Sequence, residues 1–135
     1  MRWDRDPGLA PGATQVLGPP GRDPGGRPVF VDTRNHQLDC EKIERALSPK
    51  TRAILINSPN NPTGAVYTAK DLSKVAQLAL KHKLYVIADE AYSAYVYDGM
   101  KAESLFDFEG LRPQLIVTRS FSKGHAMTGF RIGYI

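Results

Sequence analysis

The chain of 135 residues has a single cysteine, Cys40, so it can form no disulfide within itself. This usage fits a reducing compartment, and we expect a cytoplasmic protein. No apolar run approaches the roughly 18 residues of a membrane span, so the sequence predicts no membrane partner. The first residues contain no hydrophobic signal core, and the acidic residues among them argue against a transit peptide.

Clustered charge and metal ligands are also lacking. Lys and Arg total 18 against 14 Asp and Glu, and residues of both signs are interleaved along the chain. No basic block carries aromatic side chains between its charges, which argues against nucleic-acid binding. The three histidines have no cysteine or carboxylate neighbours at metal-ligand spacing, so we expect no metal site. No Gly-x-Ser-x-Gly elbow is present, which argues against a serine hydrolase.

Residues 1–26 are rich in proline and glycine and poor in apolar side chains. Such a stretch buries too little surface to offset the entropy cost of ordering it. We therefore expect residues 1–26 to be a disordered or linker-like segment, or one that is not homologous to the relatives of the folded part. Residues 27–135 are expected to be the folded part.

From residue 27 onward, apolar strands alternate with helical patterns. Strands are predicted at 28–31, 53–56, 84–88, 115–118 and 131–135. The runs at 53–56 and 84–88 are continuously apolar, which is typical of strands covered on both faces. Helices are predicted at 39–47 and 68–82, each beginning at a capping residue. This alternation indicates an α/β fold with a mostly parallel sheet and flanking helices.

Three polar stretches come after three of these strands. Residues 58–64 (Ser-Pro-Asn-Asn-Pro-Thr-Gly) come after the strand at 53–56, residues 89–92 (Asp-Glu-Ala-Tyr) end the next, and residues 120–123 (Ser-Phe-Ser-Lys) come after the third. In parallel sheets, ligands bind beyond the carboxyl ends of the strands. The sequence therefore predicts that the three stretches form one composite site.

The side chains in these stretches suit a particular chemistry. The amine of Lys123 can form a Schiff base with an aldehyde and can then carry a proton. A guanidinium such as that of Arg131 binds phosphate through two hydrogen bonds, and the hydroxyls of Ser120 and Ser122 add neutral donors. Each residue alone also has an ordinary explanation: a solvated lysine, turn-forming serines and a charge at a strand end.

Asp89 comes directly after a buried-looking strand. A carboxylate there can keep a pyridine nitrogen protonated, and it can equally cap a helical turn that begins at Glu90; the two roles are compatible. The side chain of Glu90 is expected to point away from that of Asp89 if the strand continues. The loop at 58–64, taken alone, is explained as a stiff Pro/Gly turn in which Gly64 can take a positive φ.

The three stretches, in this order, resemble the class I/II aminotransferases, pyridoxal-phosphate enzymes with the aspartate-aminotransferase fold. Residues 120–133 match the lysine-site pattern of that family at each restricted position. The resemblance implies pyridoxal 5'-phosphate as the cofactor, bound as an internal aldimine. It further implies these site residues: Lys123 for the imine, Asp89 for the pyridine nitrogen, Tyr92 and Asn61 for the phenolic oxygen, and Ser120, Ser122 and Arg131 for the phosphate.

The implied reaction transfers an amino group between an amino acid and a 2-oxo acid. The continuation at 127–129 (Met-Thr-Gly) looks most like the aspartate-type subgroup. A pyridoxal-phosphate lyase on the same fold is an alternative, because the same cofactor groups serve both reactions. A third hypothesis is a catalytically inactive fragment.

The resemblance covers residues 27–135 and implies that they are part of the family's large, cofactor-binding domain. Family members are much longer than this chain and form homodimers with shared active sites. Their glycine-rich phosphate loop and stacking aromatic have no counterpart in residues 1–26. We therefore expect this chain to correspond to the middle of such an enzyme.

Overall fold

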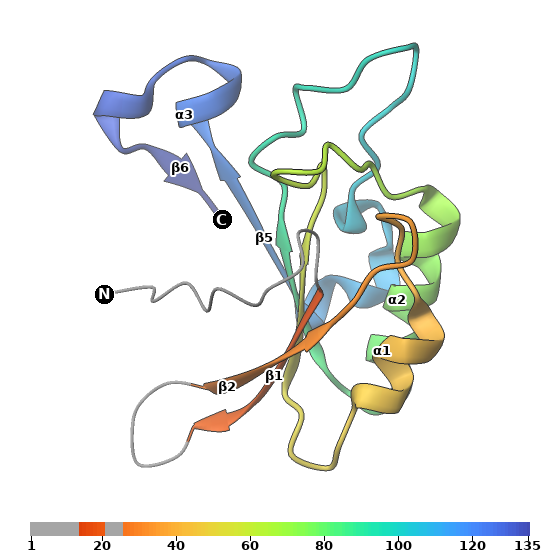
Figure 1. Cartoon of the computed structure of the whole chain (residues 1–135). Coiled ribbons are helices and arrows are strands. Elements are labelled where there is room, and N and C mark those ends of the chain that lie inside the picture. Colours follow the sequence, from red (N-terminus) through yellow and green to blue (C-terminus); the bar gives the residue numbers. More distant parts are fainter. Residues whose placement is uncertain (1–13, 21–25) are drawn as a thin grey trace.

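The computed structural model describes residues 14–20 and 26–135. In these residues a six-stranded sheet has the strand order β2-β1-β3-β4-β5-β6 (Figure 1). The strands are β1 (Thr14–Pro20), β2 (Gly26–Val31), β3 (Ala53–Asn57), β4 (Tyr85–Asp89), β5 (Leu115–Ser120) and β6 (Gly133–Tyr134). The helices are α1 (Cys40–Ala46), α2 (Ala69–His82) and α3 (Phe121–Gly124), with short 3-10 turns η1 (Leu105–Asp107), η2 (Glu109–Gln114) and η3 (Thr128–Phe130).

The centre of the sheet is parallel. β3 pairs with β4 and β4 with β5 in parallel, so that Ile56 lies opposite Ala88 and Ala88 opposite Val117. Antiparallel strands extend this centre, with β1 and β2 on one side and β6 on the other. The helix α2 connects β3 to β4, as a parallel crossover requires. The predicted α/β fold is confirmed.

The structure differs from the prediction at Thr14–Pro20, inside the segment that we expected to remain unfolded. These residues form β1, which pairs with both β2 and β3; Gln15 lies opposite Leu55 and Leu17 opposite Ala53. Pairing satisfies the backbone groups along an edge of β3, a gain that composition does not reveal. The rest of the predicted segment, 1–13 and 21–25, lies outside the described residues, and the domain division near residue 26 stays a prediction.

Helix α2 begins where its sequence predicts. The hydroxyl of Thr68 accepts a hydrogen bond from the backbone N–H of Asp71 at 3.2 Å and donates one to its carboxylate at 2.7 Å. The helix ends at Lys83, which takes a left-handed conformation with φ 54°. Helix α1 is capped in the same way by Asp39, which accepts from the N–H of Lys42 at 3.1 Å. Both predicted helices are confirmed to within two residues.

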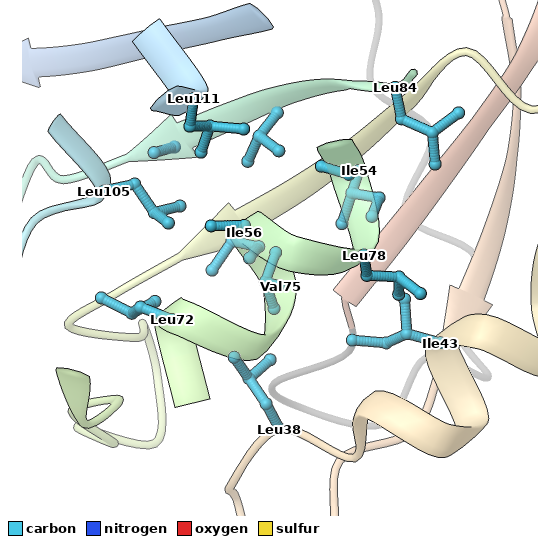
Figure 2. Close-up of a cluster of buried hydrophobic side chains, with 14 of the residues drawn as sticks. Leu38, Ile43, Ile54, Ile56, Leu72, Val75, Leu78, Leu84, Leu105 and Leu111 are labelled. Carbon is cyan, nitrogen blue, oxygen red and sulfur yellow. The ribbon is translucent and has the colours of Figure 1, made fainter. Parts of the chain in front are cut away.

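The hydrophobic core lies between the sheet and the helices α1 and α2, which are on the same side of it (Figure 1). Figure 2 shows the side chains that meet there, among them Ile54 and Ile56 of β3, Val75 and Leu78 of α2, and Ile43 of α1. Segments after β4 close one end of this core with Leu105 and Leu111, which are both buried.

Burial alternates along the central strands. In β4, Val86 and Ala88 are buried, whereas Tyr85 is 54% exposed and Ile87 is half-buried. Successive side chains of a strand point to opposite faces, and α1 and α2 cover only one of them. The prediction that the apolar runs are fully covered on both faces is therefore wrong for Tyr85.

The last predicted strand is shorter than expected. Arg131 has a left-handed backbone with φ 53°, and pairing with β5 begins only at Gly133. No helix in the described part of the chain combines the length and the apolar character needed to cross a membrane.

Candidate active site

Three polar turns meet at the carboxyl ends of the parallel strands. Asn57, the last residue of β3, lies opposite Asp89, the last residue of β4, and Asp89 lies opposite Thr118 of β5. The loop after β3, the turn after β4 and helix α3 after β5 therefore leave the sheet at one edge (Figure 1). Parallel register places the three predicted stretches at this edge.

Lys123, Tyr92 and Asn61 come together from three different turns. The side-chain amide of Asn61 donates a hydrogen bond to the hydroxyl of Tyr92 at 2.9 Å. The amine of Lys123 lies 5.5 Å from the centre of the Tyr92 ring, within the range of a cation–π contact. Lys123 and Asn61 are exposed, so a ligand in solution can reach them.

Ser120, Ser122 and Arg131 form a second group, next to Lys123. The hydroxyl of Ser120 caps α3 by accepting from the N–H of Ser122 at 3.1 Å. A guanidinium N–H of Arg131 lies 3.5 Å from the hydroxyl of Ser122 and donates to the carbonyl of Thr128 at 2.9 Å. This group places a guanidinium beside the hydroxyl of Ser122, and the hydroxyl of Ser120 caps the same turn; a cation with hydroxyls nearby suits an anionic ligand.

The carboxylate of Asp89 is half-buried at the end of β4. Its Oδ1 accepts a hydrogen bond from the N–H of Ala91 at 3.1 Å, so the capping role foreseen from the sequence is present. Because this bond holds the carboxylate in one orientation, Asp89 can also pair with a cationic or protonated group.

Asn57 is a site residue to which the sequence analysis gave no role. Its side-chain amide donates to the carbonyl of Asp89 at 3.1 Å, and its oxygen accepts from the N–H of Asn61 at 3.0 Å. Asn60 holds the same loop, because its oxygen accepts from the hydroxyl of Thr63 at 2.8 Å. Gly64 closes the loop at φ 71°, the positive value that was predicted. The available signal was an asparagine at the end of an apolar strand, before a Pro-rich turn.

Two more side chains, Tyr95 and Glu90, make hydrogen bonds to residues of the site or next to it. Tyr95, also without a predicted role, donates its hydroxyl to the carbonyl of Lys123 at 2.7 Å. Glu90 is buried, and its carboxylate accepts from Ser104 at 2.7 Å and from Arg119 at 2.7 and 3.0 Å. The hydrogen bonds that Arg119 donates to Glu90 raise the pKa of the Arg119 guanidinium above its usual value.

No group of three His, Cys, Asp or Glu side chains that could hold a metal ion occurs within residues 14–20 and 26–135. What the described site contains is an amine, a guanidinium with two hydroxyls, a carboxylate and an amide–phenol pair, on an α/β scaffold. These features define the class of protein: an α/β protein with a polar, cation-containing site at the carboxyl ends of its parallel strands, the place where such sheets bind ligands.

The chain belongs to the family of class I and II aminotransferases, whose family model matches residues 22–135. It is 45% identical over 114 residues to aromatic-amino-acid aminotransferase 2 of Thermococcus litoralis, and 40% identical over 114 residues to an aspartate aminotransferase of a Bacillus species (strain YM-2). In each comparison, 82% of this chain matches 29% of the relative, so the chain spans under a third of the length of these relatives.

The fold is also similar to a solved structure. The aromatic aminotransferase of Pyrococcus horikoshii OT3 superposes with a TM-score of 0.79 at 42% sequence identity. The superposition covers 82% of this chain and 30% of that protein. The resemblance stated from the three stretches is thus confirmed at the level of family and fold.

Proposed function

We propose that this site binds pyridoxal 5'-phosphate and serves a transaminase reaction between an amino acid and a 2-oxo acid. The observation that carries the proposal is the meeting of Lys123, Tyr92 and Asn61 from three separate turns, beside Arg131 and the serines. Membership of the aminotransferase family supports it.

The donor set fits each end of this cofactor. The guanidinium of Arg131 and the hydroxyls of Ser120 and Ser122 suit the phosphate, and the carboxylate of Asp89 suits a protonated pyridine nitrogen. The amide–phenol pair of Asn61 and Tyr92 offers hydrogen bonds to a phenolic oxygen. The residues present therefore offer partners for the phosphate, for the protonated pyridine nitrogen and for the phenolic oxygen of this cofactor.

Bound pyridoxal phosphate supplies an aldehyde carbon and a ring that withdraws electrons from the substrate. In our proposal, the amine of Lys123 would hold this group through Nζ, and the same atom would carry a proton during the transfer. The ring of Tyr92 lies 5.5 Å from Nζ, and the hydrogen bond from Tyr95 to the Lys123 carbonyl holds the backbone of Lys123. Asp89 would accept a hydrogen bond from the protonated ring nitrogen.

We propose amino acids and 2-oxo acids as substrates because the relatives named above are aromatic-amino-acid and aspartate aminotransferases. Residues 127–129 favour an aspartate-type reaction among these. A homodimeric assembly and a cytoplasmic location complete the proposal; the single cysteine suits a reducing compartment.

The test is to mix the purified chain with pyridoxal phosphate, reduce with borohydride and map the modified peptide by mass spectrometry. We expect one label per chain, on Lys123. Labels scattered over exposed lysines such as Lys50 and Lys81, or no label, would contradict the proposal. A chain labelled on Lys123 is then tested for amino-acid-dependent conversion of the cofactor to its amine form, which a lyase would not leave as the stable product.

A further inference from the structure

We propose that Glu90 and Arg119 act as a positioning pair that sets the distance between the ends of β4 and β5, and so the place of Lys123 relative to Asp89. Glu90 directly follows Asp89, and Arg119 directly precedes Ser120, the cap of α3. The inference rests on the proposed function, since it assigns a role toward the same cofactor site.

The contacts of the pair are short and directional. One carboxylate oxygen of Glu90 accepts from Nη2 of Arg119 at 2.7 Å and from Nε at 3.0 Å. The backbone of Glu90 adds a third bond between the same strands, because its N–H donates to the carbonyl of Thr118 at 2.9 Å. A planar guanidinium fork with two donors on one oxygen constrains both separation and angle, which a single donor cannot do.

The other oxygen of Glu90 ties the pair to the core. It accepts from the hydroxyl of Ser104 at 2.7 Å, and that hydroxyl in turn caps η1 by accepting from the N–H of Phe106 at 3.1 Å. The neighbouring Leu105 is buried in the core. The ends of β4 and β5 are thus connected through Ser104 to the hydrophobic core, and not only to each other.

Helix α3 depends on the contacts of Glu90 and Arg119 because it is too short to be stable without its neighbours. It has four residues, Phe121–Gly124, and a helix of one turn has no stability of its own in water. Its place is set by the end of β5, where Arg119 is the last residue before the cap, and by the bond from Tyr95 to the Lys123 carbonyl. Lys123 is carried by this helix, so a shift of Arg119 is transmitted to the amine.

The burial of the pair distinguishes it from an ordinary surface contact. The side chain of Glu90 is 6% exposed and that of Arg119 36% exposed. The ion pair of Glu44 and Lys81 has similar chemistry and a distance of 2.6 Å, but its side chains are 46% and 65% exposed, and it lies between α1 and α2, away from the site. It provides a matched control.

The experiment measures backbone hydrogen exchange by mass spectrometry in the wild-type chain and four variants. Glu90→Ala removes the carboxylate and with it the bonds to Arg119 and to Ser104. Because these bonds are charge-assisted, we expect hydrogen exchange to rise about tenfold or more in residues 119–127. Glu90→Gln keeps an oxygen for Arg119 and an amide for Ser104, so exchange should stay within about twofold of wild type. Glu44→Ala, the control, should leave residues 119–127 unchanged.

Arg119→Lys is a milder change of the same contact, and it tests the inference even if Glu90→Ala fails to fold. It keeps the charge and replaces the fork by one ammonium, so we expect an intermediate rise of about threefold in residues 119–127. In the variants of Glu90 and Arg119, any rise should be confined to these residues and to 89–95, with α2 and β3 unchanged. A uniform rise through α2 and β3 would mean that the pair is only a general stabiliser, and would overturn the inference.

Borohydride fixation of pyridoxal phosphate on Lys123 is measured on the same samples. We expect the labelled fraction to fall severalfold in Glu90→Ala and to recover in Glu90→Gln. A wild-type chain that labels on Lys123, with Glu90→Ala equal to it in label and exchange, would overturn the inference and leave the proposed function standing. A wild-type chain without label would overturn the proposed function, while the exchange pattern would still decide whether the pair positions α3.

Discussion

The side-chain amide of Asn61 donates a 2.9 Å hydrogen bond to the hydroxyl of Tyr92, joining the turn after β3 to the turn after β4. The same tyrosine presents its ring to the amine of Lys123 at 5.5 Å. Tyr92 therefore lies between the amide and the amine, in contact with both. A substitution of Tyr92 should therefore alter the positions of both Asn61 and Lys123.

Tyr92→Phe keeps the ring under Lys123 and removes only the hydroxyl. A hydrogen bond to a charged oxygen contributes about 1.5–3 kcal/mol, so we expect the affinity for pyridoxal phosphate to fall roughly 10–150-fold. Fluorescence or absorbance titration measures this. Tyr97→Phe is the control, because Tyr97 is 70% exposed. Equal affinities in the two variants would mean that the Tyr92 hydroxyl makes no contact with the cofactor.

Lys123→Ala should abolish the label that borohydride fixes at residue 123, since alanine has no amine. The folded state should persist, because Lys123 is exposed. Peptide mapping after reduction measures the label, and circular dichroism checks the fold. Lys50→Ala, another exposed lysine, should label like the wild type. A single stoichiometric label that survives in Lys123→Ala on another lysine would show that the nucleophile was assigned wrongly.

Asn57→Ala removes the group that joins the end of β3 to Asp89 and to the loop at Asn61. The carbonyl of Asp89 and the N–H of Asn61 each lose a partner, so we expect the free energy of unfolding to fall by about 1–3 kcal/mol. Urea unfolding followed by circular dichroism measures it. Gln77→Ala, at an exposed position of α2, should change it by less than about 0.5 kcal/mol. A neutral Asn57→Ala would mean that water replaces these bonds without cost.

Gly64→Ala tests the backbone of the asparagine loop. Gly64 has φ 71°, and a Cβ there would meet no atom within 4 Å, so the only cost is the left-handed conformation. We expect a loss of about 1–2 kcal/mol in the free energy of unfolding. Gly110→Ala is the matched control: its φ lies outside the left-handed range, and a Cβ would lie 4.0 Å from Leu80. Equal effects in thermal or urea unfolding would contradict the strain argument.

Several elements could be predicted because their causes are local. Thr68 and Asp71 define the start of α2 by their own hydrogen bonds, and the apolar runs that became β3, β4 and β5 are visible in the sequence. The meeting of Asn61, Tyr92 and Lys123 was predictable too. Parallel strands end at one edge of a sheet, and each of the three residues comes after such a strand.

The strand β1 could not be predicted because its cause is not local. Thr14–Pro20 lie in a Pro/Gly-rich segment, and they become a strand by pairing with β2 and β3. The exposure of Tyr85 is of the same kind: an apolar run does not tell which of its faces the helices will cover.

The sequence by itself determined the helix starts, the central strands and the types of chemical group at their ends, because these depend on side chains within a few positions of one another. Only the tertiary structure decided that Asn57 would hold Asp89 and Asn61, and that Glu90 would pair with Arg119 and Ser104. The physical reason is that a buried polar side chain must find its partners wherever the fold brings them, and the partners of Glu90 come from β5 and from the turn before η1.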